Sequence, residues 1–184
     1  MKIKNKEFEL FIPRDRIDSR VIEIGWKINK AYADKNPLFI VVLNGAFMFA
    51  ADLMKVVNIE SELSFVKVAS YSGSESTGNI KELIGLTESV SNRHVVIIED
   101  IVDTGLTMEK ILQTIHESGP ASVEIATFLL KPKSLQRTLD IKYIGFEIPS
   151  DFVVGYGLDF DGYGRNFSDV YVVSQEKKEY TQLD

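Results

Sequence analysis

The chain has 184 residues, of which 45% are hydrophobic and 26% are charged, with a net charge of −6 and no cysteine. This length is enough for one domain with a substantial core, and the lack of cysteine excludes disulfides, thiolate catalysis and cysteine-ligated zinc. No cluster of lysine and arginine supports nucleic-acid binding, and no apolar run approaches the ~20 residues that span a bilayer, so we expect a cytoplasmic protein without a membrane partner.

The first half of the chain predicts a helix, then a strand, then a second helix. Apolar residues recur at helical spacing over roughly 15–33, where Asp15 or Asp18 can cap the start. The segment 38–43 is short and continuously apolar, which is typical of a strand buried on both faces. Asn44-Gly45 then turns the chain into a second amphipathic stretch.

The second half continues the alternation of strands and helices. A helix with its apolar face between 108 and 115 ends at Gly119-Pro120, and a Ser/Gly-rich loop covers 70–79. Strands are predicted at 62–71, 80–86, 95–99, 122–131 and 143–148. This alternation predicts an α/β fold with a parallel sheet and right-handed crossovers. After about 150 the pattern changes to short aromatic segments broken by glycines.

The segment VVIIEDIVDTGLT, residues 95–107, carries the clearest chemical signal. Glu99 and Asp100 follow a buried strand, and ligands of parallel sheets bind outside the carboxyl ends of the strands. The turn from Asp103 to Thr107 leads into a helix, whose free backbone amides and hydroxyls can hold a phosphate. A ribose or a divalent metal between the acids and the phosphate reconciles their charges. The segment therefore predicts a site for a ribose phosphate.

Two other interpretations of this segment remain open on physical grounds. Acids and threonines at the start of a helix are also ordinary caps in surface loops. A metal site of the Walker B kind is a second alternative, although the chain has no G-x-x-x-x-G-K-[ST] motif to accompany it.

The whole pattern is more specific than its parts. Four apolar residues, Glu-Asp, two apolar residues and then Asp-Thr-Gly-x-Thr resemble the phosphoribosyl-pyrophosphate loop of type I phosphoribosyltransferases. From Leu38 to Val173 the chain most resembles the hypoxanthine-guanine members of that family. The resemblance implies one domain, 1–184, with a Rossmann-like parallel-sheet core at about 36–148. It also implies a small hood built from about 1–14 and 149–175, and assembly as a homodimer or homotetramer.

The activity implied by this resemblance is a step of purine salvage. The enzyme would join hypoxanthine, and guanine, to the ribose of phosphoribosyl pyrophosphate, and would release pyrophosphate with the help of Mg²⁺. Its partners would be these small molecules, and no nucleic acid.

The resemblance also implies roles for residues on the phosphoribosyl side. Asp103 would be the general base that moves the proton on the five-membered ring of the purine. Glu99 and Asp100 would hold the ribose hydroxyls and the magnesium. The phosphate groups would be held by Thr104, Gly105, Leu106 and Thr107 for the 5′-phosphate, and by Asn44, Gly45 and Arg165 for pyrophosphate.

The chain departs from the family at two of these positions. A lysine is common where Asn44 stands, and a basic residue is frequent where Leu106 stands. Both changes remove positive charge, so the backbone amides must carry more of the phosphate binding.

On the base side, the resemblance implies that the Lys131 ammonium donates to the 6-oxo group, which discriminates against adenine. Phe152 would stack on the purine and the Val153 backbone would read its edge. Asp159 would contact the base region and a second magnesium, and Ser70 and Tyr71 would open a mobile lid. Simpler interpretations remain: a lysine head extended into water, a core phenylalanine, and an ordinary surface loop.

Three rival functions are consistent with the same motifs. The first is a phosphoribosyltransferase for adenine or xanthine, of which Lys131 argues against adenine. The second is a non-catalytic regulator that senses nucleotides and binds RNA or protein, and the third is a nucleotide-binding module of an assembly. Release of pyrophosphate separates the enzyme from the last two.

Overall fold

A six-stranded sheet forms the centre of the protein in a computed structural model that describes residues 1–68 and 83–174. The strand order is β5-β4-β3-β6-β7-β8. Its strands are β3 (Leu38–Leu43), β4 (Glu62–Val68), β5 (Leu83–Ile84), β6 (His94–Val102), β7 (Ser122–Leu130) and β8 (Tyr143–Glu147). All neighbouring pairs are parallel except β4 and the short edge strand β5. The predicted parallel α/β sheet is therefore confirmed.

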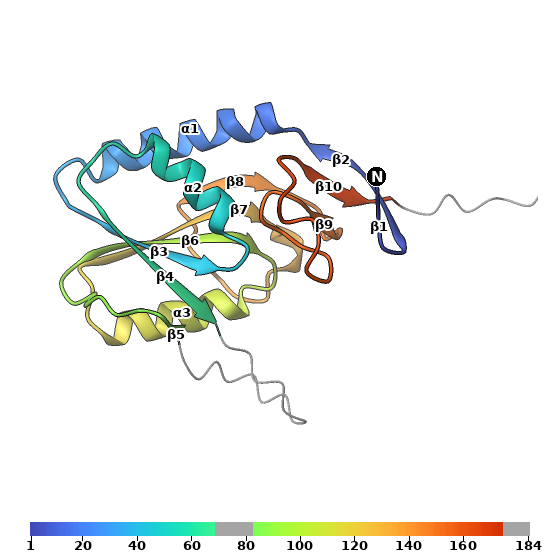
Figure 1. Ribbon diagram of the computed structural model, residues 1–184. Coiled ribbons are helices and arrows are strands. Elements are labelled where there is room, and N and C mark those ends of the chain that lie inside the picture. Colours follow the sequence, from blue (N-terminus) through green and yellow to red (C-terminus); the bar gives the residue numbers. More distant parts are fainter. Residues whose placement is uncertain (69–82, 175–184) are drawn as a thin grey trace, which may run out of the picture.

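Helices cover both faces of this sheet. Helices α1 (Arg14–Ala31) and α2 (Phe47–Val56) lie on one face, and α3 (Leu106–Glu117) lies on the other (Figure 1). A short 3₁₀ helix, η1 (Pro132–Ser134), follows β7. Because β3 and β6 are sandwiched between helices, their apolar residues pack into a core on either side of the sheet. This burial explains why the two strands read as unbroken apolar runs.

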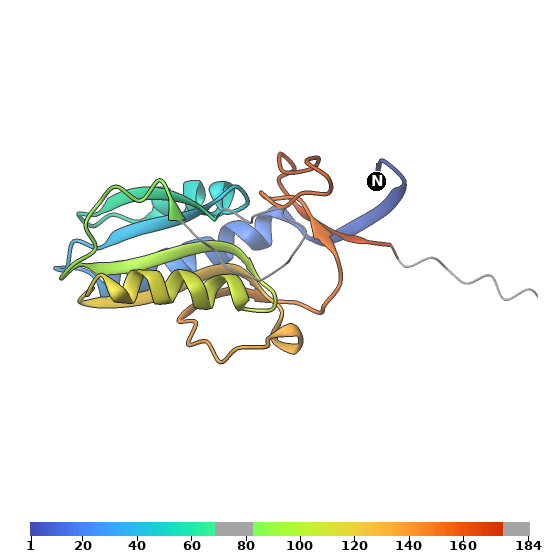
Figure 2. The same cartoon turned by 90° about the horizontal axis from the view of Figure 1, so that it is seen from below.

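A second, smaller sheet combines the two ends of the described chain. Its order is β1-β2-β10-β9, with β1 (Lys2–Ile3), β2 (Lys6–Ile12), β9 (Val153–Val154) and β10 (Val170–Val173) all antiparallel to their neighbours. It lies beyond one end of the main sheet, as both views show (Figures 1 and 2), on the side toward which the arrowheads of β3 and β4 point. This small sheet is the hood that was expected from the terminal segments.

The start of α1 differs from the prediction. Pro13 occupies the N-cap position without a side-chain cap, and neither Asp15 nor Asp18 caps the helix. Instead the backbone N–H of Arg14 donates to Oδ1 of Asp169 at 2.8 Å, a carboxylate from the far end of the chain. The helix begins one residue before the predicted start, and a residue of the hood supplies its cap.

The connections of the main sheet place a ligand-binding crevice between β3 and β6. The chain leaves β3 through α2 toward β4 on one side, and leaves β6 through α3 toward β7 on the other. The strand order thus reverses between these two strands, and open α/β sheets bind ligands at such a point, outside the carboxyl ends. Within the described ranges, no helix is long and apolar enough to cross a membrane.

Candidate active site

Strand β6 delivers three carboxylates to the crevice. It extends beyond its predicted end at 99, because its ladder with β7 continues to the pair Val102–Leu130. Glu99 and Asp100 therefore belong to the strand, and Asp103 is the first residue after it. The ladder with β3 already stops at Val41–Ile98, so the acids lie past the last paired residue on that side.

Glu99 is an ionisable residue in a buried place. It is only 8% exposed, and its Oε1 accepts the backbone N–H of Asp100 at 3.1 Å. The Asp100 carboxylate in turn accepts the N–H of Ile101 at 2.9 Å. Burial first, and then the negative charge of Asp100, raise the pKa of Glu99 well above its usual value. Two acids in this setting favour a bound cation or hydroxyl donors, which relieve the buried charge.

We expect Glu99→Gln to raise the thermal unfolding midpoint of the ligand-free protein at neutral pH. In the wild type, Glu99 is protonated in both the folded and the unfolded state below the unfolded pKa of about 4.3, so its burial costs no stability there. Folding stability is lost as the pH rises through the raised folded pKa, because the unfolded state then favours the ionised carboxylate. The gap between variant and wild type should therefore widen as the pH rises above the ordinary pKa of a glutamate. It should amount to roughly 2–4 °C for each kcal/mol relieved.

Calorimetric scans without divalent metal or substrate, at several pH values, measure this gap. Glu147→Gln, at the exposed end of β8, is the matched control and should show no such trend. A gap that is constant with pH contradicts the interpretation of Glu99 as a destabilising buried acid.

The turn after Asp103 forms a cup at the start of α3. Gly105 occupies the N-cap position with φ +80°, a conformation that L side chains rarely adopt. A cavity of about 110 Å³ is lined by Glu99, Ile101, Val102, Asp103, Thr104, Gly105, Thr107 and Met108. The first backbone amides of α3 have no partner inside the helix, which suits an anion; the Leu106 N–H makes only a long hydrogen bond of 3.4 Å to Oγ1 of Thr104. Leu106, the first residue of α3, is not among the residues that line this cavity.

Asp103 and Lys131 form an ion pair, with 2.9 Å between Oδ2 and Nζ. Each follows directly after its strand, and the register pairs Val102 with Leu130 just before them, so two residues far apart in the sequence become neighbours. The Lys131 side chain is only 9% exposed, whereas that of Asp103 is 47% exposed. The lysine head is therefore not extended into water, and that alternative is wrong.

The loop after β3 meets β6 and the hood at Gly45. The preceding peptide bond, between Leu43 and Asn44, is cis. A Cβ added at Gly45 would overlap the Asp100 carboxylate, and a Cβ at Gly157 would overlap the Gly45 carbonyl oxygen. Three separate segments thus approach so closely here that two glycines are needed.

Arg165 and Asp159 are brought together within the hood. Arg165 donates through Nη1 to the Gly157 carbonyl at 2.7 Å and pairs through Nη2 with Asp159 Oδ1 at 2.6 Å. The other oxygen of Asp159 accepts the N–H of Gly162 at 2.7 Å. Since Gly157 touches Gly45, this cluster lies beside the loop after β3.

Phe152 and Val153 belong to the hood, where Val153 begins β9 and Phe152 directly precedes it. The Phe152 ring is 40% exposed and packs against Phe8 and Phe160 at centroid distances of 6.4 and 5.7 Å. It is therefore not a core aromatic, and part of it is free for a ligand. Val153 is buried in β9, where its backbone is held by the ladder to β10.

Two residues near these groups escaped the sequence reasoning. The Lys6 ammonium lies 5.3 Å from the centroid of the Phe152 ring, and nothing in its polar N-terminal surroundings distinguishes it. Tyr156 is fully buried. Its place between two glycines in the sequence could have indicated this, because a turn that inserts an aromatic ring is one reason for such a pattern.

Two further expectations concern the lid and the metal. Ser70 and Tyr71 lie outside the described residues. Among residues 1–68 and 83–174, no three His, Cys, Asp or Glu side chains gather into a metal-binding group. The carboxylates that line the cup are those of Glu99 and Asp103, and Asp100, next to Glu99 on β6, lies against Gly45.

Comparisons with known proteins agree with this geometry. The family model of the phosphoribosyl transferase domain matches residues 13–161. The hypoxanthine-guanine phosphoribosyltransferase of Mycobacterium avium is 36% identical over 180 residues, covering 94% of this chain and 88% of the relative. The hypoxanthine phosphoribosyltransferase of Buchnera aphidicola is 39% identical over 155 residues, covering 83% of this chain and 88% of the relative.

A solved structure extends the likeness to the fold. The crystal structure of a hypoxanthine phosphoribosyltransferase from Staphylococcus aureus matches with a TM-score of 0.83 and 35% identity, covering 90% of this chain and 91% of that one. The chain belongs to the phosphoribosyl transferase family, in the same group as these hypoxanthine and hypoxanthine-guanine enzymes.

Proposed function

We propose that this protein is a magnesium-dependent 6-oxopurine phosphoribosyltransferase. It transfers the phosphoribosyl group of phosphoribosyl pyrophosphate to hypoxanthine and guanine, and so forms IMP and GMP and releases pyrophosphate. The observation that carries the proposal is the Asp103–Lys131 pair at the rim of the phosphate cup, because it combines a proton acceptor with a donor for an oxo group.

The base is recognised and deprotonated by this pair. The Lys131 ammonium donates to the 6-oxo oxygen, while the Asp103 carboxylate, freed from the lysine, accepts the proton from the ring nitrogen that attacks the ribose. Adenine carries an exocyclic amine at the same position and leaves a buried ammonium unpaired, which is costly. Phe152 offers the exposed part of its ring for stacking, and the Val153 backbone reads the base edge.

The phosphoribosyl group lies between the acids of β6 and the start of α3. The backbone amides and hydroxyls from Thr104 to Thr107 hold the 5′-phosphate, and Glu99 and Asp100 accept hydrogen bonds from the ribose hydroxyls. As positive charge develops on the ribose in the transition state, these carboxylates stabilise it.

The donor set fits magnesium. Mg²⁺ is usually bound through one or two carboxylates together with substrate phosphates and water, and the adjacent Glu99 and Asp100 provide two. Magnesium, when bound, neutralises the charge on the departing pyrophosphate. Asn44 and Gly45 from one side and Arg165 from the other contact the pyrophosphate, with Asp159 as a further magnesium contact.

Three features complete the proposal and rest on the resemblance to the family. Ser70 and Tyr71 open a lid over the site. The enzyme works in the cytoplasm. It assembles as a homodimer or homotetramer.

Pyrophosphate release tests the proposed function. The protein is incubated with phosphoribosyl pyrophosphate and Mg²⁺, and with hypoxanthine, guanine, xanthine or adenine in parallel. We expect release with hypoxanthine and guanine, and little with adenine. No release with any base contradicts the proposal, and release with adenine alone contradicts the role of Lys131.

We expect Gly45→Ala to weaken phosphoribosyl pyrophosphate strongly. The added methyl group would overlap the Asp100 carboxylate, so either the acid or the loop must move, at a typical cost of roughly 1–3 kcal/mol for overpacking. The KM for phosphoribosyl pyrophosphate should rise about tenfold or more, as measured by steady-state kinetics.

Gly119→Ala is the matched control for this substitution. Gly119 also has a positive φ, +67°, but a Cβ there would meet nothing within 4 Å, at the far end of α3. It should lose some stability with an unchanged KM. Equal KM values for the two variants contradict the close approach of Gly45 to the binding site.

A further inference from the structure

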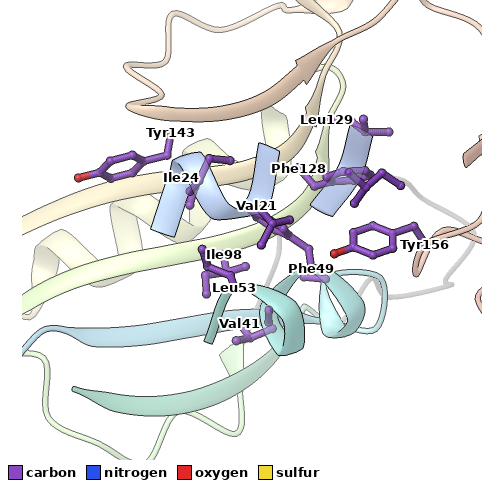
Figure 3. Close-up of a cluster of buried hydrophobic side chains, with 14 of the residues drawn as sticks. Val21, Ile24, Val41, Phe49, Leu53, Ile98, Phe128, Leu129, Tyr143 and Tyr156 are labelled. Carbon is purple, nitrogen blue, oxygen red and sulfur yellow. The ribbon is translucent and has the colours of Figure 1, made fainter. Parts of the chain in front are cut away.

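Tyr156 is a hood residue whose ring is inserted into the core that the main sheet forms with helices α1 and α2. It is fully buried, and its centroid lies 4.7 Å from that of Phe128 on β7 (Figure 3). The flanking Gly155 and Gly157 have φ values of +104° and +97°, and Tyr156 itself has φ +48°. A positive φ costs conformational energy in a residue other than glycine. The burial of the Tyr156 ring and the hydrogen bond of its hydroxyl must therefore stabilise this turn.

The Tyr156 hydroxyl is bound to a nearly buried carboxylate of α2. It donates to Oδ2 of Asp52 at 2.9 Å, and the Asp52 side chain is only 13% exposed. Arg14 and Lys55 each pair with the same carboxylate at 2.8 Å, and the Arg14 guanidinium lies 5.4 Å from the centre of the Tyr156 ring. Burial disfavours the charged form of Asp52, but hydrogen bonds from Lys55 and Tyr156 and the charge of Arg14 outweigh it and lower its pKa. The acceptor is therefore ionised near neutral pH, and the bond is charge-assisted.

This bond joins two segments that flank the proposed pyrophosphate subsite: the Gly45 loop with α2 on one side, and the hood segment from Tyr156 to Arg165, here called the Arg165 arm, on the other. Asp52 lies on α2, which begins just after Gly45. On the other arm Gly157, the residue after Tyr156, touches the Gly45 carbonyl and accepts the Arg165 guanidinium. Movement of the Tyr156 ring would therefore shift Gly157 and Arg165 relative to the loop after β3.

We infer that Tyr156 and Asp52 are positioning residues that hold the Arg165 arm against the Gly45 loop, so that pyrophosphate is contacted from both sides. The inference rests on the proposed function, since it concerns the same substrate. Tyr156 and Asp52 thus raise the affinity for the diphosphate part of phosphoribosyl pyrophosphate, and they do not contact the purine.

Tyr156→Phe removes the hydroxyl and keeps the ring. The matched control is Tyr143→Phe, because Tyr143 is also buried and its hydroxyl has no hydrogen-bond partner within the described ranges. Tyr143 lies on the opposite side of the same cluster (Figure 3). For Tyr156→Phe we expect the KM for phosphoribosyl pyrophosphate to rise about tenfold, the scale of one charge-assisted hydrogen bond. We expect kcat and the KM for hypoxanthine to change less than about twofold, and Tyr143→Phe to leave all three unchanged.

A double-mutant cycle with Asp52→Ala adds a second readout. If both residues act through their shared bond, the double variant should bind phosphoribosyl pyrophosphate no more weakly than Asp52→Ala alone. Fully additive losses overturn the inference. So does a Tyr156→Phe variant that loses thermal stability but keeps wild-type KM values, which is the result of a purely structural role.

Calorimetric binding of Mg²⁺-phosphoribosyl pyrophosphate without a base separates this inference from the proposed function. If the wild type binds it but releases no pyrophosphate with any base, the proposed function fails; the inference then stands if Tyr156→Phe binds more weakly than Tyr143→Phe. If the wild type is active and the two variants bind equally, the inference alone fails. If the wild type neither binds nor reacts, both fail.

Discussion

Replacement of Asp103 by asparagine is expected to lower kcat by about 10²- to 10⁴-fold, the usual contribution of a positioned general base. Asparagine keeps the size and one acceptor oxygen of the side chain, but it cannot take a proton. The affinity for phosphoribosyl pyrophosphate should stay within about threefold of wild type, because the cup is built mainly from backbone amides and hydroxyls of α3. Steady-state kinetics and calorimetric binding measure the two quantities.

Asp140→Asn provides the control for the loss of one negative charge, since Asp140 is exposed on the surface. It should leave kcat unchanged. Thermal unfolding of Asp103→Asn checks that the loss of its ion pair with Lys131 has not disturbed the fold. A folded Asp103→Asn enzyme with near-normal turnover removes Asp103 from the proposed mechanism.

Replacement of Lys131 by methionine is expected to raise the KM for hypoxanthine by about 10- to 100-fold, the scale of a lost hydrogen bond from a charged group. Methionine preserves the volume of a side chain that is only 9% exposed, so the packing changes little. The Asp103 carboxylate loses its partner but is 47% exposed, so water can solvate it. The KM for phosphoribosyl pyrophosphate should therefore change little.

Lys133→Met, at an exposed position two residues further along, is the matched control and should behave as wild type. The discrimination between hypoxanthine and adenine gives a second measurement. It should narrow in Lys131→Met, because the ammonium that adenine leaves unpaired is gone. Equal loss of affinity for the base and for phosphoribosyl pyrophosphate contradicts the role of Lys131 at the 6-oxo group.

The departures from the family pattern acquire a structural explanation at Leu106. Leu106 stands where the family frequently has a basic residue, and it is not among the residues that line the cavity. Anion binding at a helix start depends on backbone N–H groups, which any residue other than proline provides. At the other departure, Asn44 follows a cis peptide bond. The next residue, Gly45, brings the backbone of this loop against the Asp100 carboxylate.

Local pattern was sufficient for the main features of the fold. The continuous apolar runs at 38–43 and 95–98 predicted buried parallel strands, since both faces of such strands are covered by helices. The Glu-Asp and Thr-Gly motifs predicted a phosphate cup, since a strand end and a helix start are both encoded by neighbouring residues. The structure has β3 and β6 at these two runs, with β6 continuing to Val102 beyond its predicted end at 99.

Contacts between distant segments could not be inferred in the same way. The Asp103–Lys131 pair depends on the register of β6 and β7, and register follows from how whole strands pack. The cap of α1 was wrongly assigned to Asp15 or Asp18, because Asp169 reaches it from the other end of the chain.

The contacts of the hood show most clearly which features follow from local sequence and which follow from long-range packing. Residue types and short spacings indicated a glycine-rich aromatic segment at about 150–165, and the chemistry that its residues can perform. The insertion of Tyr156 against Phe128 and Asp52 was not indicated, because it depends on three segments that meet only once the sheet and helices have packed. Local sequence therefore specified which groups the site contains, and long-range packing specified which of them touch.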